Sequence, residues 1–214
     1  LTHVPNLNKN ITVDVAIIGG GIKGITTALM LKRAGLKGAV LEAKDVGKGT
    51  TGHSTGNLYI ITDQLLSPIK KKYNIDVLKQ VVHARGEAFK LIEDNVRQFE
   101  LDCDFKKQPM YVYEDEETNK IEKELEIARE GGIPFSEISG ADFPFEMEKG
   151  MVIRDQAHFN PLLYVQQLAN KLRSKNCEIY ENTRVNKIEE GTNEVLIDTT
   201  SGKVVAKYVL HATH

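Results

Sequence analysis

The stretch that decides the fold of this chain is Val13-Asp14-Val15-Ala16-Ile17-Ile18-Gly19-Gly20-Gly21-Ile22-Lys23-Gly24. Its first half is an apolar run, which predicts a buried strand, and its second half carries the pattern Gly-x-Gly-x-x-Gly, which predicts a tight turn into a helix. A helical run to Ala34 follows, and then a second apolar strand, Gly38 to Leu41, which leads directly into Glu42. This succession of strand, glycine turn, helix, strand and acid predicts a dinucleotide-binding unit.

Each part of the motif has a physical role in such a unit. Gly19 permits the turn, Gly21 lets backbone N–H groups approach a pyrophosphate at the positive end of the helix, and Gly24 lets helix and strand pack closely. Glu42, at the tip of the second strand, can accept hydrogen bonds from a ribose diol. The alternative is a glycine-rich turn that binds no ligand, and the register of all the parts argues against it.

The composition is that of an ordinary globular protein that acts on small molecules. Of the 214 residues, 41% are hydrophobic and 27% are charged, and the net charge of −2 gives no electrostatic reason to expect nucleic acid or an anionic membrane as partner. No apolar run approaches the ~18 residues that span a bilayer, and the N-terminus has no signal-peptide pattern. Cys103 and Cys177 stand far apart, which favours reduced thiols over a disulfide or a zinc site. We therefore expect a cytoplasmic protein.

A polar, glycine-rich loop follows the second strand. Between Gly47 and Gly56 it carries four glycines, three threonines, one serine and one histidine, too polar and too flexible a set for a core element. Such a loop can offer many backbone N–H and hydroxyl donors to a phosphate chain, whereas composition alone would equally allow a solvated surface loop. Its position directly after Glu42 favours the phosphate-binding role.

Three segments together resemble a known family. They are "DVAIIGGGIKGITTALMLKRAG…AVLEA", "GTTGHSTGN", and "QAHFNPLLYVQQLA" with the terminal "VLHATH". They resemble the flavin-dependent amine and amino-acid oxidoreductases of the D-amino acid oxidase, glycine oxidase and sarcosine oxidase group. The form "TTGHSTGN" looks most like a bacterial subgroup fused to a C-terminal Rieske iron-sulfur domain.

The resemblance implies an α/β fold, with a Rossmann-like FAD-binding domain of parallel sheet and β-meander and part of an α+β substrate domain. It implies residues 1–100 and 155–214 for the FAD-binding domain and residues 101–154 for the partial substrate domain. The implied cofactor is FAD rather than NAD. The implied cofactor-binding residues are Gly19, Gly21, Ile22, Gly24, Glu42, Ala43, Gly49, Thr50, Thr51, His53, Ser54, Gly56, Val185 (through its backbone, to adenine), Ala212 and Thr213.

Four further side chains are candidates for a site. In "GTTGH", His53 resembles the histidine that is covalently bound to the flavin in dimethylglycine-dehydrogenase-like relatives, although the aromatic residue before that histidine is Gly52 here. His53 could instead hydrogen-bond to the cofactor or the loop, or be solvated. Tyr111 and Tyr113 point to the same side of a predicted strand, where they line a substrate cavity or pack on the sheet face. His158 is a further site candidate.

The remaining pattern predicts alternating helices and strands. An amphipathic helix is expected over 75–99, a strand over 105–113, a helix over 119–130, and loop with short extended pieces over 135–151. Asn160 and Pro161 predict a capped helix start. From Cys177 the period becomes two, which predicts strands at 178–180, 184–188, 195–197 and 204–206, and a buried strand from Tyr208.

The resemblance implies an FAD-dependent oxidoreductase that oxidises an amine or amino acid by hydride transfer to the flavin. Two alternatives stay open: a non-catalytic flavin- or nucleotide-binding module, and a flavin domain that passes electrons to a Rieske partner. Two scattered cysteines cannot ligate such a cluster in this chain. Members of the family continue beyond His214, so we expect an N-terminal fragment and name no catalytic residue.

Overall fold

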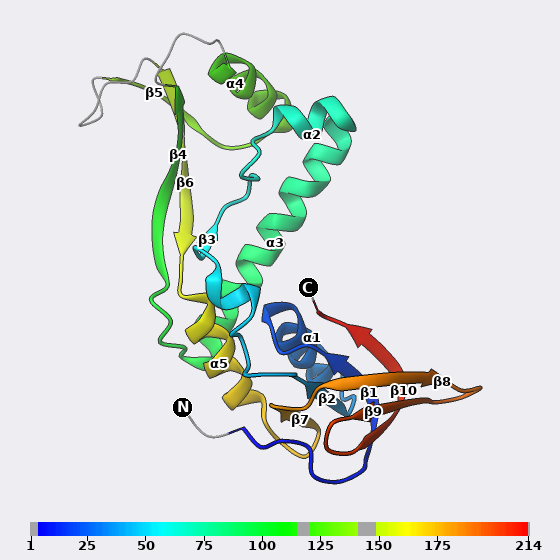
Figure 1. Ribbon diagram of the computed structural model, residues 1–214. Helices are drawn as coiled ribbons and strands as arrows, with labels where there is room; N and C mark the ends of the chain where they lie inside the picture. The colour runs from blue at the N-terminus through cyan, green and yellow to red at the C-terminus, as the bar shows by residue number, and fades with distance from the viewer. Residues whose placement is uncertain (1–3, 115–119, 141–148, 214) are drawn as a thin grey trace. The chain divides into compact units, whose positions relative to one another are not determined.

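The computed structural model describes residues 4–114, 120–140 and 149–213 (Figure 1). The chain packs into two compact units. The first unit comprises Leu1–Thr55, Phe99–Cys103 and Asn160–His214, and the second comprises Gly56–Gln98 and Asp104–Phe159. This packing groups residues 56–98 with the second unit, whereas the expected domain boundary assigned them to the FAD-binding domain.

The first unit is built on a six-stranded sheet in the order β7-β2-β1-β10-β9-β8. The first four strands in this order run parallel, and the last two complete an antiparallel meander. In Figure 1, β8 and β9 lie beside β10 and the helix α1 connects β1 to β2. The strands are β1 (Ile11–Ile18), β2 (Gly38–Leu41), β7 (Cys177–Tyr180), β8 (Val185–Glu190), β9 (Val195–Thr199) and β10 (Lys203–His211).

The helices of the first unit begin where the sequence signals predict. α1 (Ile22–Arg33) is followed by Gly35 at φ 76°, a left-handed conformation that suits glycine. α5 (Pro161–Leu172) is preceded by Asn160, whose side chain accepts a hydrogen bond from Leu163 N at 3.1 Å, so the predicted cap is confirmed. α1 and α5 pack against each other through apolar faces.

The N-terminal lead-in is part of the core of the first unit. Leu7 is fully buried, and its N–H donates to Thr183 Oγ1 at 3.0 Å. The carbonyl of Pro5 accepts a hydrogen bond from Glu181 N at 3.1 Å. No local pattern in the sequence indicates this role, because the partners of the segment lie more than 170 residues away along the chain.

The second unit combines a small antiparallel sheet with three helices. The strand order is β3-β6-β4, and β5 also pairs with β6. The predicted long helix is confirmed as α3. The elements are β3 (Asn57–Leu58), α2 (Ser67–Lys72), α3 (Ile75–Phe99), β4 (Lys106–Glu114), α4 (Lys120–Gly131), β5 (Ser136–Ser139) and β6 (Lys149–His158).

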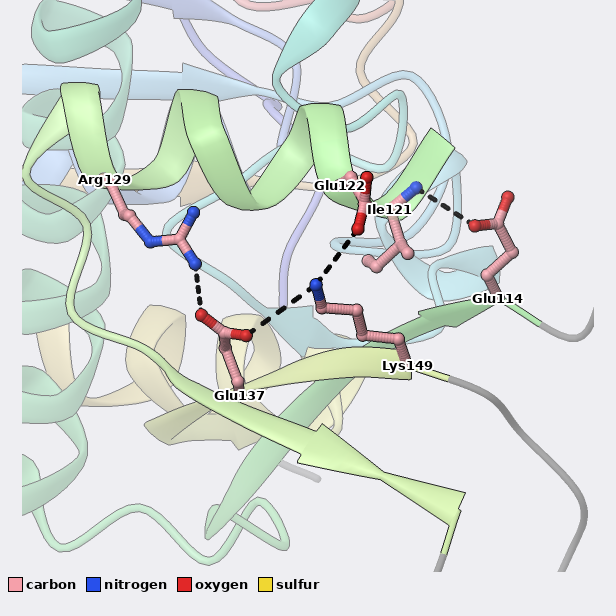
Figure 2. A network of polar contacts seen from close by, with 6 residues as sticks. All are labelled: Glu114, Ile121, Glu122, Arg129, Glu137 and Lys149. Carbon is pink, nitrogen blue, oxygen red and sulfur yellow. Dashed lines mark hydrogen bonds and ion pairs between the residues drawn. The ribbon is translucent and has the colours of Figure 1, made fainter. Parts of the chain in front are cut away.

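Charged side chains connect α4 to the strands of the second unit (Figure 2). Glu137 on β5 pairs with Arg129 on α4 and lies 4.0 Å from Lys149 Nζ, and Lys149 pairs with Glu122 at 3.2 Å. Each of these side chains is more than a third exposed, and exposed ion pairs contribute little to stability. The apolar cluster beneath, which includes Leu125, therefore supplies most of the stabilisation.

The sequence analysis missed one strand and was wrong about the burial of another. Residues 135–151 were expected to be loop with short extended pieces, and residues 149–151 instead begin the ten-residue strand β6, in which Met151 to Ile153 are buried between β4 and β5. The end of β10 was expected to be buried, but Tyr208 is 69% exposed. β9 covers only Lys203–Ala206 of β10, so the later residues keep an accessible face. The acidic stretch at 115–117 and the middle of the 135–151 loop lie outside the described residues.

Candidate functional site

A cavity of about 600 Å³ lies in the first unit at the carboxyl ends of β1 and β2. Ile18 and Leu41 are the last residues of these two strands, and Ala212 follows the end of β10. This end of an open parallel sheet is where ligands of such folds bind. The cavity is lined by Ile18, Gly19, Gly21, Ile22, Lys23, Leu41, Glu42, Ala43, Lys44, Gly47, Lys48, Gly49, Thr50, Thr51, Ser54, Arg184, Val185, Ala212 and Thr213.

The glycine turn leaves no room for side chains at two of its positions. Gly19 has φ 110°, and a Cβ there would lie 2.9 Å from the carbonyl oxygen of Ala212. A Cβ at Gly24 would lie 2.0 Å from the carbonyl oxygen of Gly19, which excludes any other residue without backbone movement. The roles predicted for these two glycines, a tight turn and close packing, are confirmed by this geometry.

The N-terminus of α1 faces the cavity and receives a cap from a distant residue. Gly21 is the N-cap and has no side chain to offer, but Thr51 Oγ1 accepts a hydrogen bond from Ile22 N at 3.1 Å. A Cβ at Gly21 would lie 3.1 Å from that hydroxyl. The positive end of a 12-residue helix and a threonine hydroxyl thus meet at one wall, an arrangement that suits an anionic group.

Glu42 is held in place by backbone N–H groups on both sides. Its Oε2 accepts from Gly20 N at 2.7 Å and its Oε1 accepts from Lys44 N at 2.8 Å. A carboxylate has about four acceptor positions, so these two bonds fix the orientation and still leave lone pairs for a diol. A Cβ at Gly20 would lie 3.0 Å from Glu42 Cβ, so the glycine preceding Gly21 makes space for the acid.

Three of the predicted cofactor-binding residues do not line the cavity. Gly24 is buried in the first turn of α1, against Gly19, and Gly56 belongs to the second unit, where its carbonyl accepts from Phe159 N at 3.0 Å. His53 is exposed, and its Nδ1 lies 2.8 Å from the carbonyl oxygen of Gly49. Because a carbonyl only accepts, Nδ1 is the donor in this contact.

Four basic residues line the cavity that the sequence analysis missed. Lys23, Lys44, Lys48 and Arg184 lie around it, with Glu42 as the acidic side chain of the lining. Lys23 Nζ donates to the carbonyl of His211 at 3.1 Å, and the hydrogen bond from Lys48 to Asp45 raises the pKa of Lys48. An electropositive rim of this kind attracts a phosphate-bearing ligand. The sequence offered one signal for three of these basic residues, their closeness to the motif: Lys23 lies within the glycine motif, and Lys44 and Lys48 lie within six residues of Glu42.

Tyr111, Tyr113 and His158 lie in the second unit. The two tyrosines are 43% and 46% exposed and alternate along β4, as the predicted strand required. His158 is the last residue of β6, where it pairs with Asn57 and Lys106. None of the three lines the cavity of the first unit, and their predicted contact with substrate stays a prediction. Among the described helices, none is both long and apolar enough to cross a bilayer.

Similarity to known proteins agrees with this geometry. The chain is 28% identical to the gamma-glutamylputrescine oxidoreductase of Escherichia coli, over 96% of the chain and 50% of that protein. It is also 28% identical to the putative Rieske 2Fe-2S iron-sulfur protein YhfW of Bacillus subtilis, over 100% of the chain and 42% of that protein. The chain therefore spans about half the length of these relatives.

Solved structures share the fold. Glycine oxidase from Geobacillus kaustophilus superposes with a TM-score of 0.77 at 19% identity, over 94% of this chain and 55% of that one. L-amino acid deaminase from Proteus myxofaciens superposes with a TM-score of 0.78 at 18% identity, over 99% and 47%. The family model described as FAD dependent oxidoreductase matches residues 14–214. This chain belongs to the family of FAD-dependent oxidoreductases.

Proposed function

We propose that this chain is the FAD-holding part of an enzyme that oxidises an amine or an amino acid. The observation that carries the proposal is the cavity at the start of α1, where the helix N-terminus, the anchored Glu42 and a basic rim converge. Two relatives whose names state an amine or amino-acid substrate, gamma-glutamylputrescine oxidoreductase and glycine oxidase, support the substrate class.

The residues present fit the adenosine diphosphate half of FAD. Glu42 would hold the ribose diol, the start of α1 and Thr51 would hold the pyrophosphate, and the backbone of Val185 would contact adenine. The glycine positions support this fit, because a Cβ at Gly19 would meet the wall of the cavity. When bound, FAD accepts a hydride from the carbon beside the substrate nitrogen. The chain's own share is to bind and orient the cofactor.

A ligand titration of the chain tests the proposal. We expect FAD to bind more tightly than FMN, since FMN lacks the adenosine half that Glu42 and Val185 would contact. Glu42→Ala should lower the affinity for FAD and leave the affinity for FMN nearly unchanged, because only FAD has the adenosine ribose that Glu42 would hold. Failure of the wild-type chain to bind FAD would overturn the proposal, and tighter binding of NAD than of FAD would favour a nicotinamide domain.

The proposed role of His53 is tested by acid precipitation. Yellow colour that is released by acid would mean non-covalent FAD, whereas colour that stays in the pellet and disappears in His53→Ala would mean a covalent bond through Nε2. Nδ1 is engaged with Gly49, so Nε2 is the ring nitrogen that such a bond would use, and the hydrogen bond from Nδ1 to Gly49 supports the alternative that His53 only shapes the loop.

An electron-transfer role is the second candidate function. The relative from Bacillus subtilis is named as a Rieske iron-sulfur protein, which supports a Rieske partner or domain for this flavin unit. Anaerobic mixing with gamma-glutamylputrescine or glycine separates the two proposals from a passive binding module: substrate-dependent bleaching of the flavin requires catalysis. We also propose a cytoplasmic location, supported by Cys103 and Cys177, which are buried and form no disulfide.

A further inference from the structure

The loop at residues 43–55 contains a four-residue turn of a kind that can adopt a type I or a type II form. Lys48 N donates to the carbonyl of Asp45 at 3.2 Å, so residues 45–48 form a four-residue turn. Its third residue, Gly47, has φ 78°, which is the value of a type II turn. The type I and type II forms differ by a flip of the central peptide, here the bond between Val46 and Gly47.

Both polar groups of this central peptide have partners. Gln166 Nε2, from α5, donates to the carbonyl of Val46 at 3.2 Å, and Gly47 N donates to the carbonyl of Gly20 at 3.1 Å. A flip would turn the Val46 carbonyl toward the Gly20 carbonyl, so that two acceptors face each other, and would break the hydrogen bond from Gln166 Nε2. Gly20 and Gln166, as oriented in the structure, therefore favour the type II form.

The preceding peptide is fixed by a third group. Glu181 Oε1, from the segment after β7, accepts a hydrogen bond from Val46 N at 2.7 Å, and hydrogen bonds to a charged acceptor are the stronger kind. The side chain of Val46 is only 2% exposed, so the residue is held by packing as well. Glu181 also lies close enough to Lys48 to contribute, after Asp45, to the raised pKa of that lysine.

The turn determines where the walls of the cavity lie. Lys44 on one side and Gly47, Lys48 and Gly49 on the other all line it, whereas Gln166 and Glu181 do not. We propose that Gln166 and Glu181 are positioning residues for FAD, which act by holding the peptides on both sides of Val46 in the form that lines the cavity. This inference rests on the proposed function only in naming FAD as the ligand.

The neighbouring glutamine provides a matched control. Gln167, also on α5, uses its side-chain amide in the same way, because its Oε1 accepts from Asp102 N at 2.9 Å and its Nε2 donates to the Asp102 carbonyl. Asp102 does not line the cavity. We expect Gln166→Ala to weaken FAD binding roughly tenfold, the effect of one lost hydrogen bond, and Gln167→Ala to leave it unchanged.

Glu181 is tested with its conservative variant. Glu181→Ala should weaken FAD binding roughly tenfold, and Glu181→Gln should restore it to within about threefold of wild type, because the amide oxygen can still accept from Val46 N. Glu190→Ala, at an exposed position on β8, is the control for loss of a glutamate. Thermal melts of each variant record any general loss of stability, which would not be rescued selectively by Glu181→Gln.

Amide hydrogen exchange of the ligand-free chain separates this inference from the proposed function. Peptides that cover residues 43–50 should exchange roughly tenfold faster in Gln166→Ala than in Gln167→Ala. Equal exchange in the two variants, or equal FAD affinities of Gln166→Ala, Glu181→Ala and wild type, would overturn the inference. If the wild-type chain does not bind FAD but residues 43–50 still exchange faster in Gln166→Ala than in Gln167→Ala, the proposed function is overturned. The conclusion that Gln166 holds the turn would then still stand.

Discussion

Glu42 in the first unit and Glu124 in the second unit each accept two backbone N–H groups, and the two sites differ in what surrounds them. In the first unit, Glu42 accepts from Gly20 N and Lys44 N and is half-buried at the cavity wall. In the second unit, Glu124 accepts from Leu66 N at 2.7 Å and from Ser67 N, and is only 3% exposed. Hydrogen bonds to backbone N–H groups therefore do not by themselves identify a ligand site. What distinguishes Glu42 is that its carboxylate also lines a cavity, where its remaining lone pairs can accept hydrogen bonds from a ligand.

The largest effect is expected at Glu124. Glu124→Ala leaves the N–H groups at the start of α2 without acceptors inside the core, which should lower the free energy of unfolding by about 3 kcal/mol. Glu124→Gln keeps one acceptor and should cost roughly half as much. Urea unfolding measures both, with the exposed Glu126→Ala on the same helix as control. Equal stability of Glu124→Ala and Glu126→Ala would contradict a structural role.

At Glu42 the effect should appear in binding more than in stability. Glu42→Ala removes the anchored acceptor and should weaken FAD binding between roughly ten- and a hundredfold, the range for loss of a charged hydrogen bond. Its unfolding free energy should fall by less than that of Glu124→Ala, since Glu42 is half-buried. Titration with FAD and urea unfolding of both variants form a crossed test. The comparison breaks if Glu124→Ala weakens FAD binding as much as Glu42→Ala does.

A third carboxylate, Glu178, makes the stability of the first unit depend on pH through its neighbour Tyr180. Burial, then the charge of Glu178 and a hydrogen bond to it, raise the pKa of Tyr180 to about 12. Since the ordinary value is about 10, folding favours the neutral phenol, and this contribution is full below pH ~10 and is lost as the pH rises toward the folded-state value. Tyr180→Phe should therefore lose less stability than wild type between these limits.

Urea midpoints at several alkaline pH values measure this difference. Tyr208→Phe, at a position that is 69% exposed, is the control and should follow wild type. A parallel decline of wild type and Tyr180→Phe would show that Glu178 and burial do not hold the Tyr180 proton.

The smallest effect is expected on the charged face of α4. Glu137→Gln breaks the pairs with Arg129 and Lys149 shown in Figure 2, yet both partners are exposed, so the unfolding free energy should change by less than about 1 kcal/mol. The change should shrink further in 0.5 M salt. Urea unfolding at two salt concentrations measures it, and a loss as large as that of Glu124→Ala would remove the distinction between exposed and buried carboxylates.

Elements with local signals were predictable from the sequence. The structure confirms three such elements: the glycine turn, the helix over 75–99 and the Asn160 cap. Each is determined by residues that are close to one another in the sequence. β6 was not predicted as a strand, because its burial comes from β4 and β5, which pair with it from other parts of the chain. The exposed end of β10 was missed for the same reason.

The sequence by itself determined the dinucleotide-binding unit, since the glycine spacing and the acid after the second strand require a particular backbone path, and its resemblance to a known family implied the fold class and most of the cavity wall. Only the tertiary structure decided which residues complete and hold that wall. Arg184 reaches the cavity from the segment before β8, and Gln166 and Glu181 meet at Val46 from positions at least 120 residues away. No local pattern records such meetings, because a side chain that bonds to a distant peptide group leaves no periodicity in its own segment.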